Sequence, residues 1–268
     1  MSGGKTALIA GGGDLPVKFL ENVLIKNREI IVFAVDKNAG RKSRQLGFET
    51  YDIAVTRLGE IIKKSVRLRV KKTVILGYVD HRHLLKNINF DFRSLKALWG
   101  ASDWRAGSIM RSIIREIEKS GIKVISPATL LSGIIAEKGV MGRVKPGKKE
   151  MAEVEFAYKM AQKLSAADIG QTVIVKRSVV VAAEAQEGTD LCIIRGAKTA
   201  GKGFIIAKAA RPGQDMRFDV PVIGPATISL AVTYGAKGIA VSAGKTFLIN
   251  KSVIIKDADR RGIFIIGM

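Results

Sequence analysis

The most constraining feature of this 268-residue chain is its opening pattern of apolar runs and glycines. An apolar run at residues 6–10 ends in Gly11-Gly12-Gly13, and Leu, Val and Phe then recur at helical spacing over residues 15–26. A second apolar run, residues 30–35, is closed by Asp36. This pattern predicts a strand, a glycine turn, a helix and a second strand, which together make a β-α-β unit.

The same alternation continues along the first half of the chain. An apolar run at residues 73–76 is followed by a helical pattern over residues 108–119, and Gly121 separates that helix from a strand pattern at residues 123–126. Strands this uniformly apolar, alternating with helices, are typical of a parallel sheet that is covered on both faces. We therefore expect an α/β fold in which residues 1–138 form a Rossmann-like domain around a parallel sheet.

The second half of the chain differs in texture. Residues 139–149 are rich in glycine, lysine and arginine, which favours a linker or hinge. A helix is predicted over residues 151–164, a hairpin from the runs 172–176 and 179–183, and a further helix near residues 226–234. The later apolar runs are residues 203–207, 238–241, 246–249 and 262–266. Residues 150–268 are thus predicted to form a C-terminal catalytic α/β domain with a mixed sheet.

Composition narrows the class of partner. The formal charge of +21 should attract polyanions such as nucleotides, nucleic acids or an anionic membrane leaflet, and a solvated lysine-rich surface is the alternative. Aromatic residues make up only 6% of the chain, and no zinc-finger spacing or RNP-like run occurs, which argues against nucleic acid. The pattern contains neither a signal peptide nor the roughly 18 uninterrupted apolar residues of a membrane span. We expect a cytoplasmic protein that at most rests on a membrane surface.

Cysteine usage agrees with this location. Cys192 is the single cysteine, so an intramolecular disulfide is excluded and the composition suits a reducing compartment. With no histidine partner nearby in the sequence, Cys192 is expected to be a small core residue rather than a nucleophile.

The glycine turn is the first candidate site. Gly11, Gly12 and Gly13 place bare backbone N–H groups at the start of a predicted helix, where they and the helix dipole can hold a phosphate. The turn lacks the G-x-G-x-x-G spacing and the Walker lysine, so neither a dinucleotide fold nor a P-loop follows from it. A tight turn that merely needs positive φ is the alternative.

Two segments of the second half carry more chemistry. Residues 184–190 hold three carboxylates, Glu184, Glu187 and Asp190, which could bind a divalent cation through oxygen or simply form an acidic turn that caps the next helix. Residues 208–221 interleave cations with Asp215 and Asp219, and such a set can neutralise a diphosphate while a carboxylate orients water or holds a metal. Spacing does not rank these two aspartates, because either could pair with a surface arginine.

Two weaker signals remain. His81 and His83 follow Asp80 and could in principle ligate a metal, although no third ligand stands near them in the sequence. Trp99 and Trp104 flank a glycine-containing segment and either line an apolar surface or pack in the interior.

Four stretches occur in a characteristic order: LIAGGGDLP (8–16), DIGQ (168–171), AEAQEGTD (183–190) and QDMRFDVPVIG (214–224), the last followed by Thr227. Together they resemble the LpxI family of UDP-2,3-diacylglucosamine pyrophosphatases, and the likeness covers nearly the whole chain. The resemblance implies Mg²⁺-dependent hydrolysis of UDP-2,3-diacylglucosamine to UMP and 2,3-diacylglucosamine 1-phosphate (lipid X), a step in lipid A biosynthesis, with water attacking the β-phosphorus. It also implies two domains with the lipid product held between them.

The resemblance assigns roles to individual residues. The essential aspartate of the family lies in an R-x-D-x-P segment, which makes Asp219 the leading catalytic candidate here. The expected catalytic residues are Asp219, Arg217 and Lys208. The expected Mg²⁺ ligands are Asp219, Glu187 and Asp190. The expected substrate-binding residues are Gly11, Gly12, Gly13, Leu15, Gln186, Thr189, Gln214 and Thr227.

The chain departs from the family pattern at three places. Family members often carry Gly-Asp-Asp before the helix that is predicted near Ser108, whereas this chain has Ala106-Gly107 there and Asp103 out of register. Arg211-Pro212 replaces a common Lys-Pro and keeps the charge. Gly77-Tyr78-Val79-Asp80 is an unusual form of a Gly-x-Val turn. The first departure puts a metal-binding role for the N-terminal domain in doubt.

Two other classes of function stay open from sequence. The β-α-β start with Asp36 after the second strand also fits an NAD(P)-dependent oxidoreductase, in which a carboxylate binds the ribose. The charge also fits a nucleic-acid-binding module whose affinity falls steeply with salt. We expect the protein to be a homodimeric hydrolase that lies on the inner leaflet of the cytoplasmic membrane and has no nucleic-acid partner.

Overall fold

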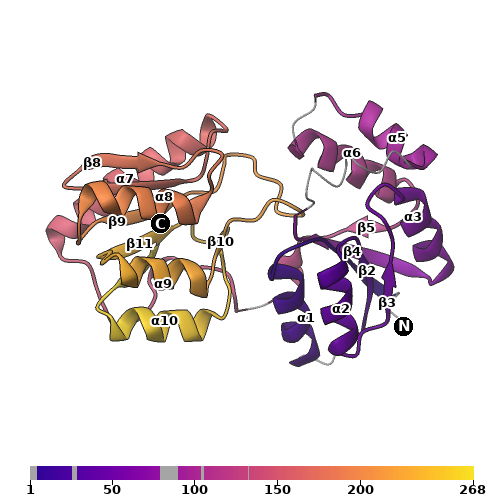
Figure 1. Cartoon of the computed structure of the whole chain (residues 1–268), viewed down its shortest axis with the longest axis horizontal. Helices are drawn as coiled ribbons and strands as arrows, with labels where there is room; N and C mark the ends of the chain where they lie inside the picture. Colours follow the sequence, from indigo (N-terminus) through magenta and orange to yellow (C-terminus); the bar gives the residue numbers. More distant parts are fainter. Residues whose placement is uncertain (1–4, 26–28, 79–89, 104–105, 132) are drawn as a thin grey trace. The chain divides into compact units, whose positions relative to one another are not determined.

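The structure of the protein is a computed structural model that describes residues 5–25, 29–78, 90–103, 106–131 and 133–268. The chain divides into two compact units, each of which is described by itself (Figure 1). Unit 1 contains residues up to Leu131 together with the short segment Met216–Asp219, and unit 2 contains Ser132–Asp215 and Val220–Met268. Both units are α/β, one with a parallel and one with a mixed sheet, so the predicted fold class is confirmed.

Unit 1 is built on a five-stranded sheet, in which all of the pairings between the described strands are parallel. The strands are β1 (Lys5–Ala10), β2 (Ile30–Ala34), β3 (Thr50–Asp52), β4 (Val70–Leu76) and β5 (Lys123–Val124). Their order is β3-β2-β1-β4-β5, so the chain moves outward from β1 in one direction and then returns to the other side of it at β4. In open parallel sheets, ligands bind at the carboxyl ends of the strands beside such a reversal.

Helices cover both faces of this sheet. They are α1 (Leu15–Ile25), α2 (Lys37–Gln45), α3 (Leu58–Arg67), α5 (Phe92–Trp99) and α6 (Ala106–Glu118), followed by the 3-10 turn η1 (Pro127–Thr129). Right-handed crossovers place α1 and α2 on one face, because β1, β2 and β3 advance in one direction. One core cluster joins α3, α5 and α6 to the other face, through residues such as Ile61, Ala97 and Ile117.

Pattern and structure differ most at α2. Its sequence, KNAGRKSRQ, is too polar for an apolar stripe, so periodicity predicts no helix there. The carboxylate of Asp36 accepts a hydrogen bond of 2.9 Å from the backbone N–H of Ala39 and caps the helix, while Ala39, Gly40 and Ser43 are buried. Asp36, which the sequence also offers as a ribose ligand, therefore caps helix α2.

Unit 2 is built on a six-stranded mixed sheet of order β6-β13-β11-β9-β7-β8. The strands are β6 (Gly139–Val140), β7 (Thr172–Lys176), β8 (Val179–Ala183), β9 (Ile205–Lys208), β11 (Gly238–Val241) and β13 (Phe264–Gly267). Strands β9, β11 and β13 are parallel, while β7, β8 and β6 are antiparallel to their neighbours. The predicted hairpin is confirmed with the same bounds for β7 and β8, and β10 (Val222–Ile223) pairs with β12 (Phe247–Leu248) in a separate small sheet.

Two apolar cores flank the six-stranded sheet. The helices are α7 (Lys148–Ala166), α8 (Thr189–Ala200), α9 (Pro225–Thr233) and α10 (Lys251–Arg260). Helix α7 packs on one face through Val154, Ala157 and Ala161, and α8, α9 and α10 lie on the other face (Figure 1). Cys192 of α8 is fully buried in this second core, which confirms that it is a core residue.

The segment expected to link two domains is part of unit 2. Residues 139 and 140 form β6, which pairs with β13, and Met141 is buried. Asp259 of α10 accepts hydrogen bonds from the backbone N–H groups of Arg143 and Val144, at 2.7 and 3.1 Å. These contacts hold the segment within unit 2, and the first boundary between the two units lies at Leu131 and Ser132.

Some sequence expectations lie outside the described residues. These are the possible metal ligands His81 and His83, and also Trp104. Of the helices that the structure describes, none combines the length and the apolar character needed to cross a bilayer.

Candidate functional site

A buried polar network occupies the edge of the unit 2 sheet where β9 ends. Lys208 is the last residue of β9, and it lies opposite Thr172, the first residue of β7, in the antiparallel register. The side chain of Lys208 donates a hydrogen bond of 2.6 Å to Oγ1 of Thr189, the first residue of α8. Thr189 in turn donates a bond of 3.0 Å to Oε1 of Glu184. A strand end, a strand start and a helix start thus meet at one hydroxyl group.

The donors and acceptors of this network balance. Thr189 has one hydroxyl proton, which goes to Glu184, so its lone pairs accept from Lys208 and from Thr172, whose Oγ1 lies 3.3 Å away. The other carboxylate oxygen of Glu184 accepts a bond of 3.2 Å from the backbone N–H of Gln171. Glu184 and Lys208 are each only 9% exposed. Because buried charges require partners, this network holds an acid and a base in fixed positions.

The DIGQ stretch explains how the network is enclosed. At Gly170 any Cβ atom would lie 2.2 Å from the carbonyl oxygen of Glu184, so only glycine lets the two backbones approach. Asp168 forms an ion pair with Arg211, which connects this stretch to the cation-rich segment after β9. Two of the sequence motifs are therefore joined physically in unit 2.

The loop after β8 holds the remaining carboxylates of unit 2. Arg195 of α8 donates to the carbonyl of Ala183 at 2.7 Å and pairs with the carboxylate of Glu187. This hydrogen bond from Arg195 lowers the pKa of Glu187, and the backbone N–H groups of Glu187 itself and of Ala185 act in the same direction. Glu187 therefore stabilises the loop between β8 and α8 to which it belongs. Gln186 and Asp190 are exposed, and Asp190 stands in the first turn of α8.

On the α7 side of the same sheet edge lies a pocket of about 360 Å³. The hydroxyl groups of Tyr158 and Ser242 are 2.8 Å apart in its wall, and Ser242 also accepts a bond of 2.8 Å from the backbone N–H of Ala210. Lys245 and Gln162 add a cation and an amide to the lining. Residues 209 and 210, which follow Lys208, thus run from the buried network to this pocket.

The segment with Arg217 and Asp219 belongs to unit 1, although it comes late in the sequence. Phe218 packs against the core cluster under α3, α5 and α6. The guanidinium of Arg217 lies 3.3 Å from a carboxylate oxygen of Glu118 at the end of α6. Asp219 is half-buried in the same segment. Their position in the sequence predicts that these residues belong to the C-terminal domain. They belong to unit 1 instead, because Phe218 packs on the core of that unit.

Two of the three N–H groups of the glycine turn, which are expected from the sequence to hold a phosphate, donate to backbone carbonyl groups. The backbone N–H of Gly11 donates to Leu76 and that of Gly12 to Tyr78, each at 2.8 Å, so these two groups extend the pairing of β1 with β4. At Gly77, where φ is +92°, a Cβ atom would lie 2.6 Å from Gly12 O. Of the three N–H groups predicted to hold a phosphate, only that of Gly13 has no backbone acceptor among the described residues.

An exposed aromatic ring covers this turn. Tyr78 is 67% exposed, and Cβ atoms added at Gly12 and Gly13 would lie 3.2 Å from its ring atoms. The ring therefore lies directly on the glycine turn, at the carboxyl ends of β1 and β4. Leu15, which begins α1 after the turn, is half-buried.

The other predicted residues are placed as follows. Gln214 accepts a bond of 2.7 Å from the backbone N–H of Arg211, while its Nε2 is buried with no hydrogen-bond partner in the described part of the chain. Thr227 is 7% exposed in the first turn of α9. Of the predicted site residues, the structure joins Lys208 and Thr189 by a hydrogen bond in unit 2. Arg217, Asp219 and the glycine turn all belong to unit 1.

The geometry brings forward three residues that are not among the predicted site residues. Thr172 and Glu184 complete the network around Thr189, and Tyr78 covers the glycine turn. The sequence marks Glu184 as one of the three carboxylates of residues 184–190, but nothing local indicates that it is buried. The positions of Thr172 and Tyr78 depend on pairing between segments that are far apart in the sequence.

The fold and the network define the class of two-unit α/β proteins in which a buried acid and a buried base are joined at the end of a strand. Models of the LpxI N-terminal domain and the LpxI C-terminal domain match residues 5–134 and 137–266. The chain is 30% identical to UDP-2,3-diacylglucosamine pyrophosphatase LpxI from Caulobacter vibrioides, over 98% of this chain and 97% of that relative. The chain therefore belongs to the LpxI family.

Proposed function

We propose that this protein hydrolyses the pyrophosphate bond of UDP-2,3-diacylglucosamine to UMP and 2,3-diacylglucosamine 1-phosphate. The observation that carries the proposal is the similarity over 98% of the chain to a relative that bears the name of this activity. Water attacks the β-phosphorus, a bond forms between its oxygen and that phosphorus, and the bond from the β-phosphorus to the bridging oxygen breaks. UMP leaves with the bridging oxygen, and the lipid keeps the new phosphate.

Lys208 is the cation that we assign to the diphosphate in unit 2. Its ammonium group is held by Thr189, which Glu184 and Thr172 hold in turn. A positioned charge stabilises a transition state more effectively than a mobile one, because no reorganisation is needed as negative charge develops. Glu184 and Thr172 act through Thr189 and are positioning residues.

Arg217 and Asp219 are the groups that we assign in unit 1. Glu118 fixes the guanidinium of Arg217, and Phe218 anchors the segment on the core. Asp219 orients the attacking water or binds a cation. Gln214, whose buried Nε2 lacks a partner among the described residues, supplies a further hydrogen bond to the substrate.

A Mg²⁺ ion fits part of the predicted ligand set. No group of three or more His, Cys, Asp or Glu side chains suited to a metal occurs within the described ranges. Mg²⁺ often takes only one or two carboxylates and completes its shell with substrate phosphates and water. Within unit 2, the exposed Asp190 suits that role better than Glu187, which Arg195 engages. Within unit 1, Asp219 is the predicted ligand that suits it. When bound, the ion would neutralise charge on the diphosphate.

The lipid nature of the substrate sets the proposed location. A substrate with two acyl chains resides in a bilayer, and the charge of +21 favours an anionic leaflet. We place the protein peripherally at the cytoplasmic face of the inner membrane. We also propose that it is a homodimer, and light scattering would measure its mass.

The decisive experiment measures UMP release from UDP-2,3-diacylglucosamine by the purified protein, with Mg²⁺ and with EDTA. Hydrolysis in ¹⁸O-labelled water should place the label in the lipid phosphate and not in UMP. Absence of UMP release would refute the proposal. Label in UMP would refute attack at the β-phosphorus, and undiminished turnover in EDTA would refute the role of Mg²⁺.

Two aspartates of one motif provide a matched comparison. Asp219→Ala should nearly abolish turnover while the variant keeps its fold and still binds substrate, whereas Asp215→Ala should retain most of the activity. Equal activity of Asp219→Ala and the wild type would remove Asp219 from the mechanism.

A further inference from the structure

Helix α5 exposes an aromatic pair on one face. Phe92 is 76% exposed and Trp99 is 77% exposed, more than any other large apolar side chain that the structure describes. The two residues are seven positions apart, which is about two helical turns, so their side chains lie along the same line of the helix. Lys96 is exposed at the intermediate turn of this line. We call Phe92, Lys96 and Trp99 the α5 face.

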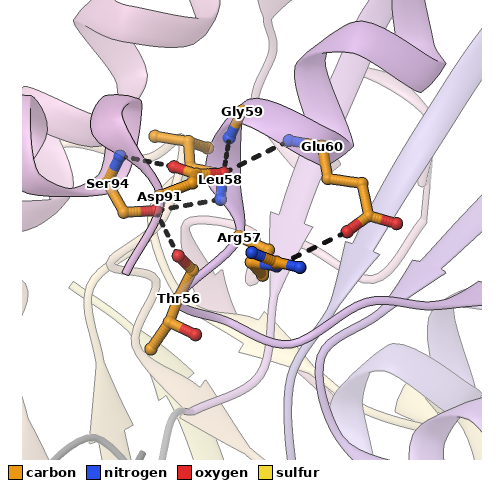
Figure 2. A network of polar contacts seen from close by, with 7 residues as sticks. All are labelled: Thr56, Arg57, Leu58, Gly59, Glu60, Asp91 and Ser94. Atoms are coloured by element: carbon orange, nitrogen blue, oxygen red, sulfur yellow. Dashed lines mark hydrogen bonds and ion pairs between the residues drawn. The ribbon is translucent and has the colours of Figure 1, made fainter. Parts of the chain in front are cut away.

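On its other side, α5 is joined by hydrogen bonds to the start of α3 in the same unit (Figure 2). Asp91 caps α5 by accepting from the backbone N–H of Ser94 at 2.8 Å, and its other oxygen accepts from Gly59 of α3 at 2.6 Å. Ser94 donates to the carbonyl of Thr56 at 2.7 Å and accepts from Leu58 at 3.0 Å. The helix is therefore held in a defined orientation that leaves its aromatic pair outside.

The electrostatic surroundings of the α5 face are basic. Lys96 and the neighbouring Arg93 are exposed, and neither forms an ion pair with any residue that the structure describes. Of the nearby acids, Asp91 caps both helices and Glu116 forms an ion pair of 2.7 Å with Lys119. The hydrogen bond from Lys119 lowers the pKa of Glu116, and the charges of Lys96 and Arg93 act in the same direction. Three cations, Lys96, Arg93 and Lys119, thus act on the single carboxylate of Glu116, and the face combines two apolar rings with a local excess of positive charge.

We propose that the α5 face docks on an anionic lipid surface. Tryptophan and phenylalanine are suited to the boundary between headgroups and acyl chains, and lysine can place its ammonium group among anionic headgroups while its methylenes stay in the apolar layer. A second protein copy fits less well, because the helix is about 12 Å long. A standard protein interface takes about 800 Å² from each partner. The inference rests on the proposed function, since a diacylated substrate lies in such a surface.

Vesicle binding tests the proposal directly. The probe is a vesicle of phosphatidylcholine that contains phosphatidylglycerol, compared with a vesicle of phosphatidylcholine alone, and cosedimentation measures the bound fraction. The wild type should bind the anionic vesicle. The double variant Phe92→Ser, Trp99→Ser should bind it more than about tenfold more weakly, because two apolar side chains no longer enter the layer. Lys96→Gln should bind about fivefold more weakly.

A matched control removes exposed apolar side chains elsewhere. Leu191 of α8 and Val253 of α10 are 57% and 59% exposed, and Leu191→Ser, Val253→Ser should bind vesicles like the wild type. Equal loss in both double variants would overturn the proposal, because binding would then not depend on α5. Thermal unfolding of each variant verifies that its fold is intact.

A fluorescence measurement tests the proposal if the double variant fails to fold. The chain has two tryptophans, so in Trp104→Phe the emission comes from Trp99 alone. Its emission should shift to the blue when the anionic vesicle is added, as the ring leaves water. An unchanged spectrum with vesicle-bound protein would overturn the proposal.

Activity separates this inference from the proposed function. On substrate dispersed in detergent, Phe92→Ser, Trp99→Ser should release UMP at the rate of the wild type. If the wild type releases no UMP but its vesicle binding depends on the α5 face, the proposed function fails and the docking surface stands. If the double variant changes the mass measured by light scattering and not vesicle binding, the face serves self-association and the inference fails.

Discussion

The ammonium group of Lys208 and the hydroxyl of Thr189 are joined by a hydrogen bond of 2.6 Å between the end of β9 and the start of α8. Thr189→Val removes that hydroxyl and leaves Lys208 without this anchor. We expect turnover to fall by roughly a hundredfold, because small misplacements of catalytic groups have effects of that order. The loss should also lower the free energy of unfolding by about 1–3 kcal/mol, since buried Glu184 loses a donor.

Thr189→Ser is the control for this prediction. Serine keeps the hydroxyl that bridges Glu184 and Lys208, so turnover should stay within a few-fold of the wild type. UMP release and thermal unfolding measure the two effects. If valine and serine behave alike in the activity assay, the hydrogen-bond network does not position Lys208.

Phe218 should determine how firmly its segment is held. Phe218→Ala removes the side chain that packs on the unit 1 core, and we expect the free energy of unfolding to fall by about 1–3 kcal/mol, less than for a fully buried phenylalanine. Turnover should fall as well, because Asp219 is the next residue. Phe218→Leu should restore most of both, and denaturant unfolding with UMP release measures them. Full activity in Phe218→Ala would contradict the anchoring role.

Asp91 and Asp36 allow a comparison of two caps. Asp91 accepts backbone hydrogen bonds at the starts of α3 and α5, whereas Asp36 caps α2 alone. Asp91→Ala should therefore destabilise the protein by about 2 kcal/mol and Asp36→Ala by about 1 kcal/mol, at roughly 1 kcal/mol for each cap. Denaturant titration followed by circular dichroism gives both values. A smaller effect at Asp91 than at Asp36 would refute the double role.

Cys192 should be chemically silent in the folded protein. Burial raises the pKa of its thiol from 9.0 to about 11, so at pH 8 the thiol is protonated and inaccessible. Iodoacetamide should modify it only after unfolding, as mass spectrometry would detect. Because the folded pKa is raised, the contribution of this thiol to stability is complete below pH 9 and is lost between pH 9 and about pH 11. Rapid alkylation of the native protein at pH 8 would contradict this.

Tyr78 should matter for binding more than for chemistry. Its exposed ring on the glycine turn offers a flat surface to the base or sugar of the proposed substrate. Tyr78→Ala should raise KM by about two- to tenfold, since such aromatic contacts contribute about 0.5–1.5 kcal/mol, and should leave kcat nearly unchanged. Tyr78→Phe should behave as the wild type. A fall in kcat at unchanged KM would show that the ring acts in the reaction step.

Local patterns in the sequence determined much of the fold. Uniformly apolar strands and helical spacing predicted the parallel sheet, and the hairpin of β7 and β8 followed from two β-rich runs around Arg177 and Ser178. Both residues have positive φ, which a tight turn requires. Helix α2 was not predicted because its buried residues, Ala39, Gly40 and Ser43, are small or polar and form no apolar stripe.

Only the tertiary structure decided how the functional residues are grouped. The motifs marked Lys208 and Thr189 as candidates, but the network with Thr172 and Glu184 exists because β7 pairs with β9 and α8 packs beside them. Likewise, the packing of Phe218 assigns Asp219 to unit 1. Sequence periodicity reports which face of an element is apolar, whereas these groupings arise from contacts between residues that are distant along the chain.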